Sequence, residues 1–331
     1  MELLKKLTLS ASPSGRENAV REIISEQLNG FCDESYTDAL GNLICHKKGE
    51  GKKLMICAHM DEIGFMITYI DDAGFLRFAP IGGIAKHNTI NTPVEFINGV
   101  KGKISYQNKE NPSSINFDKM YIDIGASEKS EAESKVQIGD MAVYSGCFEI
   151  MGDKVMSKSL DDRSGCWAVI RALQNLKESN NDIYAVFTAQ EEVGLRGAKT
   201  AANLINPDIA IAVDVSNVGD TPESNELNLK LGYGPGIKLK DASFIIHETV
   251  KALLLECAKK GDVPYQLEAA NTGGTDVGAI HLSGGGIASG TISIPTRYIH
   301  SASEVIDRRD LENTVLLLQK VLETDIESFI I

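Results

Sequence analysis

The chain has 331 residues, of which 43% are apolar and 24% charged, so it can bury the core of a globular protein. A length of this size predicts roughly two domains. The formal net charge of −13 argues against binding to nucleic acid or to an anionic membrane, because both attract basic surfaces. No apolar run is long enough to span a bilayer, and the six cysteines form no CxxC pair. We therefore expect a cytoplasmic protein with reduced thiols.

The N-terminal part of the chain predicts helices and short strands. Residues 16–30 repeat apolar side chains at helical spacing, and a pair of strands is expected between Tyr36 and Cys45. Residues 53–58 form a short apolar run that leads directly into His59. This run is typical of a buried strand.

Between residues 64 and about 151 the pattern changes. Many short alternating runs, such as FMITYI and GKISY, are separated by Gly, Pro and Asn. This pattern is typical of a small β-barrel or sandwich. We therefore predict an inserted β domain at residues 64–153.

From residue 154 onward, helical and strand patterns alternate again, which favours a sheet with parallel strands. We expect helices at 164–176, 197–204, 243–260 and 307–329, and strands at 183–189, 209–215, 265–270 and 287–294. Residues 1–63 and 154–331 are thus predicted to form one α/β domain that is interrupted by the β domain.

Side chains that can bind metal follow several of these strands or lie in the adjoining loops. They are His59, Asp161, Glu191, Glu192, Asp214 and His300. In α/β sheets, ligands bind beyond the carboxyl ends of the strands. Imidazole and carboxylate groups suit zinc, cobalt or manganese, and this set is larger than one catalytic zinc ion needs. It suits two metal ions that share a bridging carboxylate.

Each of these residues also has a simpler explanation when it is taken alone. Glu191 and Glu192 could be a solvated strand end, and Asp161 could belong to a capping cluster at a helix start. Adjacent residues of a strand point to opposite faces, so both glutamates reach one site only if the strand ends or bends there. Gly194 indicates such an end. The joint position of these residues at strand ends is stronger evidence than any one of them.

Six motifs in order give the chain a family resemblance. They are AHMDEIG (58–64), LDDRSG (160–165), TAQEEVGLRGA (188–198), AVDV (212–215), GGTD (273–276) and PTRYIHS (295–301). With these motifs the chain resembles the tetrahedral or glutamyl aminopeptidases, a family of co-catalytic metallopeptidases. The resemblance covers essentially the whole sequence. Two departures, Ala302 and Ser216, touch none of the expected ligands.

The resemblance implies a fold and an activity. The fold is a phosphorylase/hydrolase-like α/β sandwich with an inserted small β-barrel-like dimerisation domain, assembled into dimers and often into a dodecamer. The activity is a metal-dependent aminopeptidase that removes N-terminal residues from peptides by means of a water molecule between two divalent ions. Zinc, cobalt or manganese could serve as the two ions.

The resemblance also implies roles for individual residues. The metal ligands are His59, Asp161, Glu192, Asp214 and His300, with Asp161 between the two ions. Glu191 is the general base and Asp61 orients His59. The peptide bond between Asp161 and Asp162 is expected to be cis.

Two other functions compete with this one. A glycosidase would use paired carboxylates, but it gives His59 and His300 no role. A non-catalytic assembly protein would keep the metal ions for structure alone, but it gives no role to Asp61 and Glu191, which bind no metal in this scheme.

Overall fold

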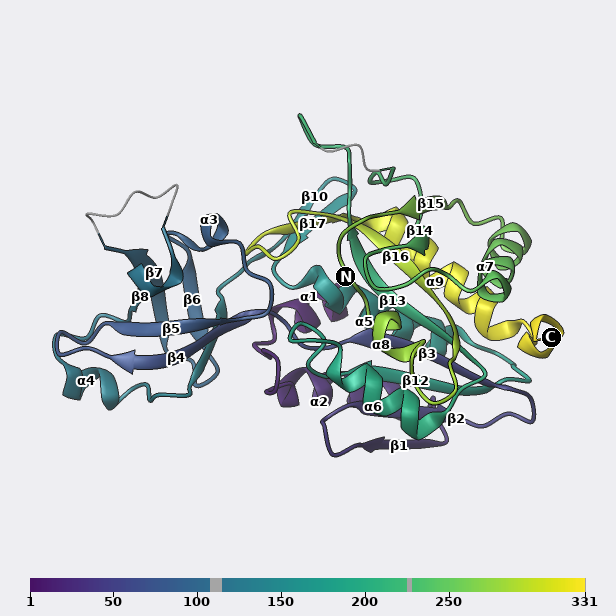
Figure 1. Ribbon diagram of the computed structural model, residues 1–331, viewed down its shortest axis with the longest axis horizontal. Helices are drawn as coiled ribbons and strands as arrows, with labels where there is room; N and C mark the ends of the chain where they lie inside the picture. The colour runs from purple at the N-terminus through teal and green to yellow at the C-terminus, as the bar shows by residue number, and fades with distance from the viewer. Residues whose placement is uncertain (108–114, 225–227, 331) are drawn as a thin grey trace.

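A computed structural model describes residues 1–107, 115–224 and 228–330 of the chain. Its two parts are visible in Figure 1: an α/β layered part built on a large sheet, and a β-barrel beside it at the left of the view. Each part has a buried apolar core of its own. The predicted fold class, an α/β domain with an inserted β-barrel, is confirmed.

The described strands of the large part form an 11-stranded sheet. Nine of them follow the order β1 (Glu34–Thr37), β2 (Leu43–Lys47), β12 (Asp182–Thr188), β3 (Lys53–His59), β13 (Ile209–Asn217), β16 (Ala288–Arg297), β17 (Glu304–Asp307), β11 (Lys154–Ser157) and β10 (Phe148–Met151). Of the remaining two, β14 (Gly236–Lys240) pairs with β16, and β15 (Gln266–Ala269) pairs with β14. Neighbours among β12, β3, β13 and β16 are parallel, so their carboxyl ends meet at one edge.

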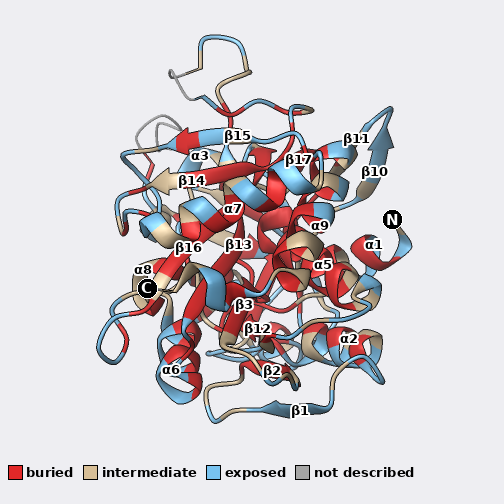
Figure 2. Cartoon of the chain, turned by 90° about the vertical axis from the view of Figure 1, so that its right-hand side faces the viewer, coloured by how far each residue is buried: buried red, intermediate tan, exposed pale blue. Residues whose placement is uncertain are grey.

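Helices cover both faces of this sheet, which explains why the central strands are almost continuously apolar. The helices are α1 (Glu2–Leu9), α2 (Asn18–Leu28), α5 (Leu160–Asn175), α6 (Arg196–Ile205), α7 (Glu248–Lys260), α8 (Val277–Ile280) and α9 (Arg308–Glu323). α5 packs against β3 and β13 and also contacts α1, α2 and α9. Figure 2 shows α6 and α8 on the other side of the strands, with the buried residues concentrated between the layers.

The barrel closes through six strands. Their order around it is β4 (Gly64–Ile70), β5 (Leu76–Ile81), β8 (Met120–Asp123), β7 (Lys101–Tyr106), β6 (Pro93–Phe96) and β9 (Met141–Tyr144). Short helices accompany them: α3 (Lys86–Thr89), α4 (Lys129–Glu133) and the 3-10 turn η2 (Phe117–Lys119). The ring of Phe65 packs edge-on against Phe78 and Tyr144 in the core, with centroid distances of 5.1 and 5.3 Å.

The elements depart from the sequence expectations mainly at their ends. The helix expected at 243–260 begins only at Glu248, because His247 is extended and the Ile246 amide donates to the Leu239 carbonyl. The helix expected at 307–329 ends at Glu323 and is followed by a 3-10 turn, η3 (Ile326–Phe329). The last barrel strand, β9, ends at Tyr144, and the next strand, β10, belongs to the large sheet. The predicted division of the chain at 63/64 and 153/154 stays a prediction. Among the residues with described positions, no helix has both the length and the apolar character to cross a membrane.

Candidate metal centre

The predicted site residues lie together at the carboxyl edge of the parallel strands. His59 is the last residue of β3 and pairs in register with Thr188, the last residue of β12. Asp214 lies near the end of the adjacent strand β13, and His300 follows β16. Asp161 comes from the first turn of α5, which starts beside this edge. Local sequence therefore places each group within a few residues of the end of a strand or the start of a helix.

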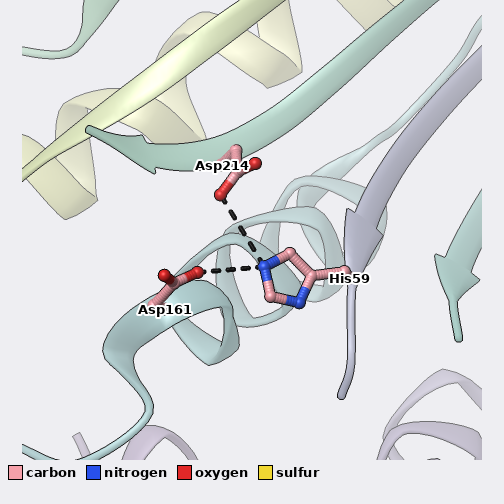
Figure 3. A group of neighbouring side chains, drawn as sticks. All are labelled: His59, Asp161 and Asp214. Carbon is pink, nitrogen blue, oxygen red and sulfur yellow. Dashed lines mark hydrogen bonds and ion pairs between the residues drawn. The ribbon is translucent and has the colours of Figure 1, made fainter. Parts of the chain in front are cut away.

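His59, Asp161 and Asp214 form a first group with metal-binding geometry. The Nε2 atom of His59 lies 2.9 Å from Asp161 Oδ1 and 3.8 Å from Asp214 Oδ1 (Figure 3). All three residues are buried, and their donor atoms lie within 4.8 Å of one another. One cation could contact all three.

A second group joins Asp161 to Glu192 and His300. The Nε2 atom of His300 lies 3.2 Å from Asp161 Oδ2 and 3.2 Å from Glu192 Oε2. The three donor atoms again lie within 4.8 Å of one another. Asp161 thus presents one oxygen to each group, which is the arrangement of a carboxylate between two metal ions.

Backbone carbonyls fix the orientation of both imidazole rings. His300 Nδ1 lies 2.7 Å from the Gly83 carbonyl, which the segment after barrel strand β5 contributes. His59 Nδ1 lies 3.2 Å from the Asp61 carbonyl and 3.5 Å from its carboxylate oxygen Oδ1. With a proton on Nδ1 of each ring, Nε2 would offer its lone pair to a cation bound among the carboxylates. This is the tautomer that a metal ligand needs.

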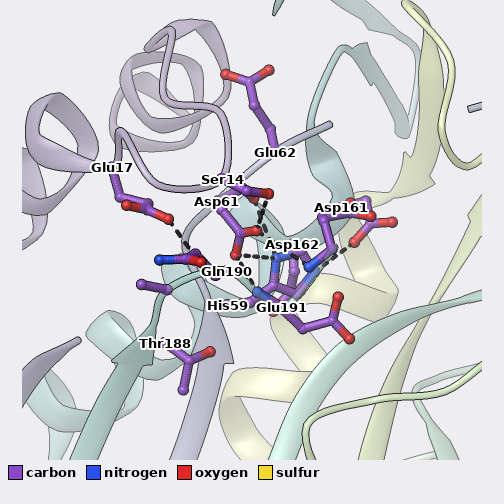
Figure 4. Close-up of polar contacts among 12 residues, drawn as sticks. Ser14, Glu17, His59, Asp61, Glu62, Asp161, Asp162, Thr188, Gln190 and Glu191 are labelled. Atoms are coloured by element: carbon purple, nitrogen blue, oxygen red, sulfur yellow. Dashed lines mark hydrogen bonds and ion pairs between the residues drawn. The ribbon is translucent and has the colours of Figure 1, made fainter. Parts of the chain in front are cut away.

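The carboxylate of Asp61 also holds the backbone of the two neighbouring glutamates. It accepts hydrogen bonds from the Glu191 amide at 3.0 Å and from the Ser14 hydroxyl at 2.6 Å (Figure 4). It also accepts one from the Glu192 amide at 3.2 Å. These contacts clamp the turn that follows β12. Sequence reasoning assigned Asp61 to His59 alone and did not identify this second set of contacts.

The turn after β12 explains how two adjacent glutamates can serve one site. The strand ends at Thr188, and Gln190 and Gly194 have positive φ angles of 58° and 120°. The chain therefore leaves the extended conformation before either glutamate. Both side chains line the same cavity, which has a volume of about 840 Å³. Among the described residues, no hydrogen-bond partner is found for the Glu191 carboxylate, whereas Glu192 contacts His300.

The electrostatics of the site fit a bound cation. Burial raises the pKa of Asp214 to about 8, and it raises the pKa of Glu191 well above its usual range. Burial lowers the pKa of His300, but contacts with Asp161 and Glu192 outweigh this effect and raise the pKa to about 12. Asp214 and Glu191 are thus destabilised as anions, and divalent cations would offset the repulsion among the carboxylates of the site.

A further observation supports this fit. The cavity is also lined by Lys238, but this lysine lies 3.4 Å from Glu268 and its charge is matched there. The acidic ligand set is therefore left without an equal positive charge from the protein. The peptide bond between Asp161 and Asp162 is cis, as the resemblance implied.

Glu304 is a site residue that sequence reasoning missed. It begins β17, and its carboxylate accepts hydrogen bonds from the backbone amides of Asp161 and His300. No motif marks it, although its place four residues after His300 would allow such a contact.

Comparison with known proteins identifies the family. A model of the family described as M42 glutamyl aminopeptidase matches residues 41–317. A provisionally named aminopeptidase of Acetivibrio thermocellus is 53% identical over 97% of this chain and 98% of its own length. The lysyl aminopeptidase of Pyrococcus furiosus is 35% identical over 97% of this chain and 96% of its own length.

Solved structures agree with this assignment. An aminopeptidase of the archaeon Desulfurococcus kamchatkensis superposes with a TM-score of 0.96 at 40% identity, covering 99% of this chain and 96% of that one. The TET1 peptidase of Pyrococcus horikoshii, described as assembling into a tetrahedron or a large octahedral shell, gives 0.89 at 34% identity over 97% and 98%. A Thermotoga maritima structure described as an endoglucanase gives 0.84 at 33% identity over 99% and 97%. The chain therefore belongs to the M42 glutamyl aminopeptidase family and is an aminopeptidase.

Proposed function

We propose that this aminopeptidase works with two divalent metal ions that share one carboxylate. One ion is held by His59, Asp161 and Asp214, and the other by Asp161, Glu192 and His300. The observation that carries this proposal is the position of Asp161, whose Oδ1 faces His59 while its Oδ2 faces His300. The mixture of imidazole and carboxylate ligands suits zinc, cobalt or manganese.

In this proposal Glu191 moves the proton. Bound divalent ions supply Lewis acidity, which acidifies a water molecule and polarises the scissile carbonyl. The Glu191 carboxylate lines the cavity and is free of hydrogen bonds from described residues, so it can accept the proton of the attacking water. It can then return that proton to the leaving amine.

Asp61 supports the reaction by holding its neighbours. Its hydrogen bonds with the amides of Glu191 and Glu192 hold the backbone from which the two side chains extend. Its carboxylate also lies beside Nδ1 of His59. This position serves both a ligand and the base. A change at Asp61 is therefore expected to affect metal binding and proton transfer together.

A panel of aminoacyl-p-nitroanilides tests this proposal. Metal-free protein would be assayed alone and after addition of zinc, cobalt or manganese. We expect release of p-nitroaniline only with added metal. Blocking the amino group of the substrate should stop the reaction, since the cleaved bond follows the N-terminal residue. Equal activity in verified metal-free protein would contradict the two-metal proposal.

A glycosidase is the second candidate, and the likeness to a structure described as an endoglucanase favours it. Glycoside hydrolysis needs only two carboxylates. It leaves unexplained why the Nε2 atoms of His59 and His300 both face Asp161. Hydrolysis of β-glucan that survives a chelator would favour the glycosidase, whereas chelator-sensitive peptide hydrolysis would exclude it as the main activity.

We also propose that the inserted domain at residues 64–153 forms a dimer, and that dimers assemble into a dodecamer. The barrel stands beside the large sheet rather than within its layers (Figure 1), which leaves its outer surface available to a second copy. The shell described for the Pyrococcus horikoshii peptidase supports the higher assembly. Light scattering should give the mass of an oligomer, and a stable, active monomer would contradict the proposal.

A further inference from the structure

Glu304 lies against the backbone of two proposed metal ligands, Asp161 and His300. It is only 2% exposed. Its Oε2 accepts a hydrogen bond from the amide of Asp161 at 2.9 Å, and its Oε1 accepts one from the amide of His300 at 2.9 Å. Both oxygens of one buried carboxyl group are thus bound to the backbone of two proposed metal ligands.

The two amides come from separate elements. Asp161 lies in the first turn of α5, whereas His300 lies in the segment between β16 and β17. His300 and Tyr298 have positive φ angles of 61° and 62°, a conformation that L-residues rarely adopt. Such a segment keeps its shape only where the surroundings hold it. The bond from His300 to Glu304 is one such restraint.

We propose that Glu304 is a positioning residue for the second ion, which the site would hold between Asp161, Glu192 and His300. The two oxygens of a carboxylate have a fixed separation, so they also fix the separation of the two amides that they bind. This spacing brings His300 Nε2 to within 3.2 Å of Asp161 Oδ2. The inference rests on the two-metal function proposed above and adds a residue that binds no metal itself.

The test is the substitution Glu304→Gln, which keeps the size of the side chain. The Gln amide has one acceptor oxygen, so its NH2 group would face the second backbone N–H and repel it. Loss of a group that orients metal ligands typically weakens metal affinity by about 10–100-fold. We expect this loss for one of the two ions. The other ion keeps His59 and Asp214, so its affinity should fall much less.

Metal-free protein is titrated with Co²⁺, and binding is monitored by calorimetry and by the visible absorption of the bound ion. The absorption reports the coordination geometry of each ion, which a merely structural role of Glu304 would leave unchanged. The control is Asp310→Asn. Asp310 is equally buried, and it also accepts two backbone amides, those of Gly232 and Gly234, at 2.6 and 2.7 Å. It lies outside the ligand set, so both affinities should stay at the wild-type level.

The outcomes separate the two proposals. If the wild-type protein binds no divalent ion in the cavity, the two-metal function itself fails. If the wild type binds two ions and E304Q binds both with unchanged affinity and spectrum, only the role of Glu304 is overturned. Should E304Q fail to fold, Glu304→Asp keeps the carboxylate but shortens its reach, and the same selective loss of one ion is expected. A loss of equal size in Asp310→Asn would also overturn the inference.

Discussion

The barrel and the carboxyl edge of the large sheet bury different kinds of side chain. In the barrel, the buried residues are almost all apolar, such as Phe65, Phe78 and Phe96, and Thr89 is the one buried polar residue among those described. At the sheet edge, residues such as His59 and Asp161 are buried although they carry charge or can gain it. The two regions lie in one chain, so the difference reflects what each region does.

The contrast has an energetic meaning. Burial of a large apolar side chain stabilises a fold by about 1.5–3 kcal/mol. Burial of an unpaired charge is costly, and proteins keep such charges only where a partner or a ligand compensates for them. The barrel interior is therefore stabilised by apolar packing, whereas the sheet edge keeps buried charged groups that a bound cation would compensate.

The largest expected effect is that of metal removal. Dialysis against a chelator should abolish peptide hydrolysis, and added zinc or cobalt should restore it, because the carboxylates alone supply no Lewis acid. Circular dichroism should show that the fold persists, since the two apolar cores do not depend on the ions. If activity persists after elemental analysis has confirmed metal removal, the sheet edge does not need a bound cation for peptide hydrolysis.

The next largest effect is expected from substitutions that distinguish the roles of Glu191 and Glu192. Glu191→Gln removes the proposed base and should lower kcat by about 10²–10⁴-fold while two ions stay bound. Glu192→Gln removes a ligand and should weaken one ion, and excess metal should restore part of the activity. Both variants are assayed and analysed for metal together. A loss of metal in E191Q, with both ions kept in E192Q, would reverse the assignment.

A change in the barrel core should affect stability and leave the metal site alone. Phe65 is fully buried, so Phe65→Ala is expected to lower the free energy of unfolding of the barrel by about 3–5 kcal/mol. Denaturant unfolding measures this loss. Metal affinity of the folded protein should equal that of the wild type. Reduced metal affinity in F65A would show that the barrel core influences the site, which the barrel contacts through Gly83 and His300.

The smallest expected effect concerns Asp307, a buried acid of the large part that forms ion pairs with Lys154 and Arg309. Burial raises the pKa of Asp307, but Arg309 and Lys154 outweigh this effect and hold the pKa at about 2. A lowered pKa stabilises the fold above the unfolded-state value of about 3.9, and this contribution is lost as the pH falls through about 2. Because water screens the pair, we expect about 1 kcal/mol.

Unfolding measured from pH 4 down to pH 2 should show this loss in the wild type and not in Asp307→Asn. The same loss in both proteins would contradict the assignment of the effect to Asp307.

Much of the candidate site could be predicted from sequence, because its proposed ligands follow apolar strands and lie within short motifs. His59 after residues 53–58 and Asp214 in AVDV are examples. The second contacts of Asp61 and the role of Glu304 could not be predicted. Each depends on hydrogen bonds from backbone amides that are distant in sequence or positioned by a turn. Every residue type except proline has such an amide, so the sequence does not show which amide a carboxylate will bind.

The fold shows the same limit. The barrel and the alternation of helices and strands follow from local patterns. Strand β14 was not predicted, since only pairing with β15 and β16 identifies residues 236–240 as a strand. The start of α7 at Glu248 was also missed, because local propensity extends the helix backward and tertiary hydrogen bonds override it.

The most direct test of the account is the number of ions bound by Asp161→Ala. Elemental analysis after reconstitution with zinc should give about two ions per chain in the wild type and about one in His300→Ala or Asp214→Ala. In Asp161→Ala both ions lose a ligand, so fewer than one tightly bound ion is expected. If Asp161→Ala keeps two ions, or loses only the one that His300→Ala loses, then Asp161 does not join two ion positions and the account is wrong.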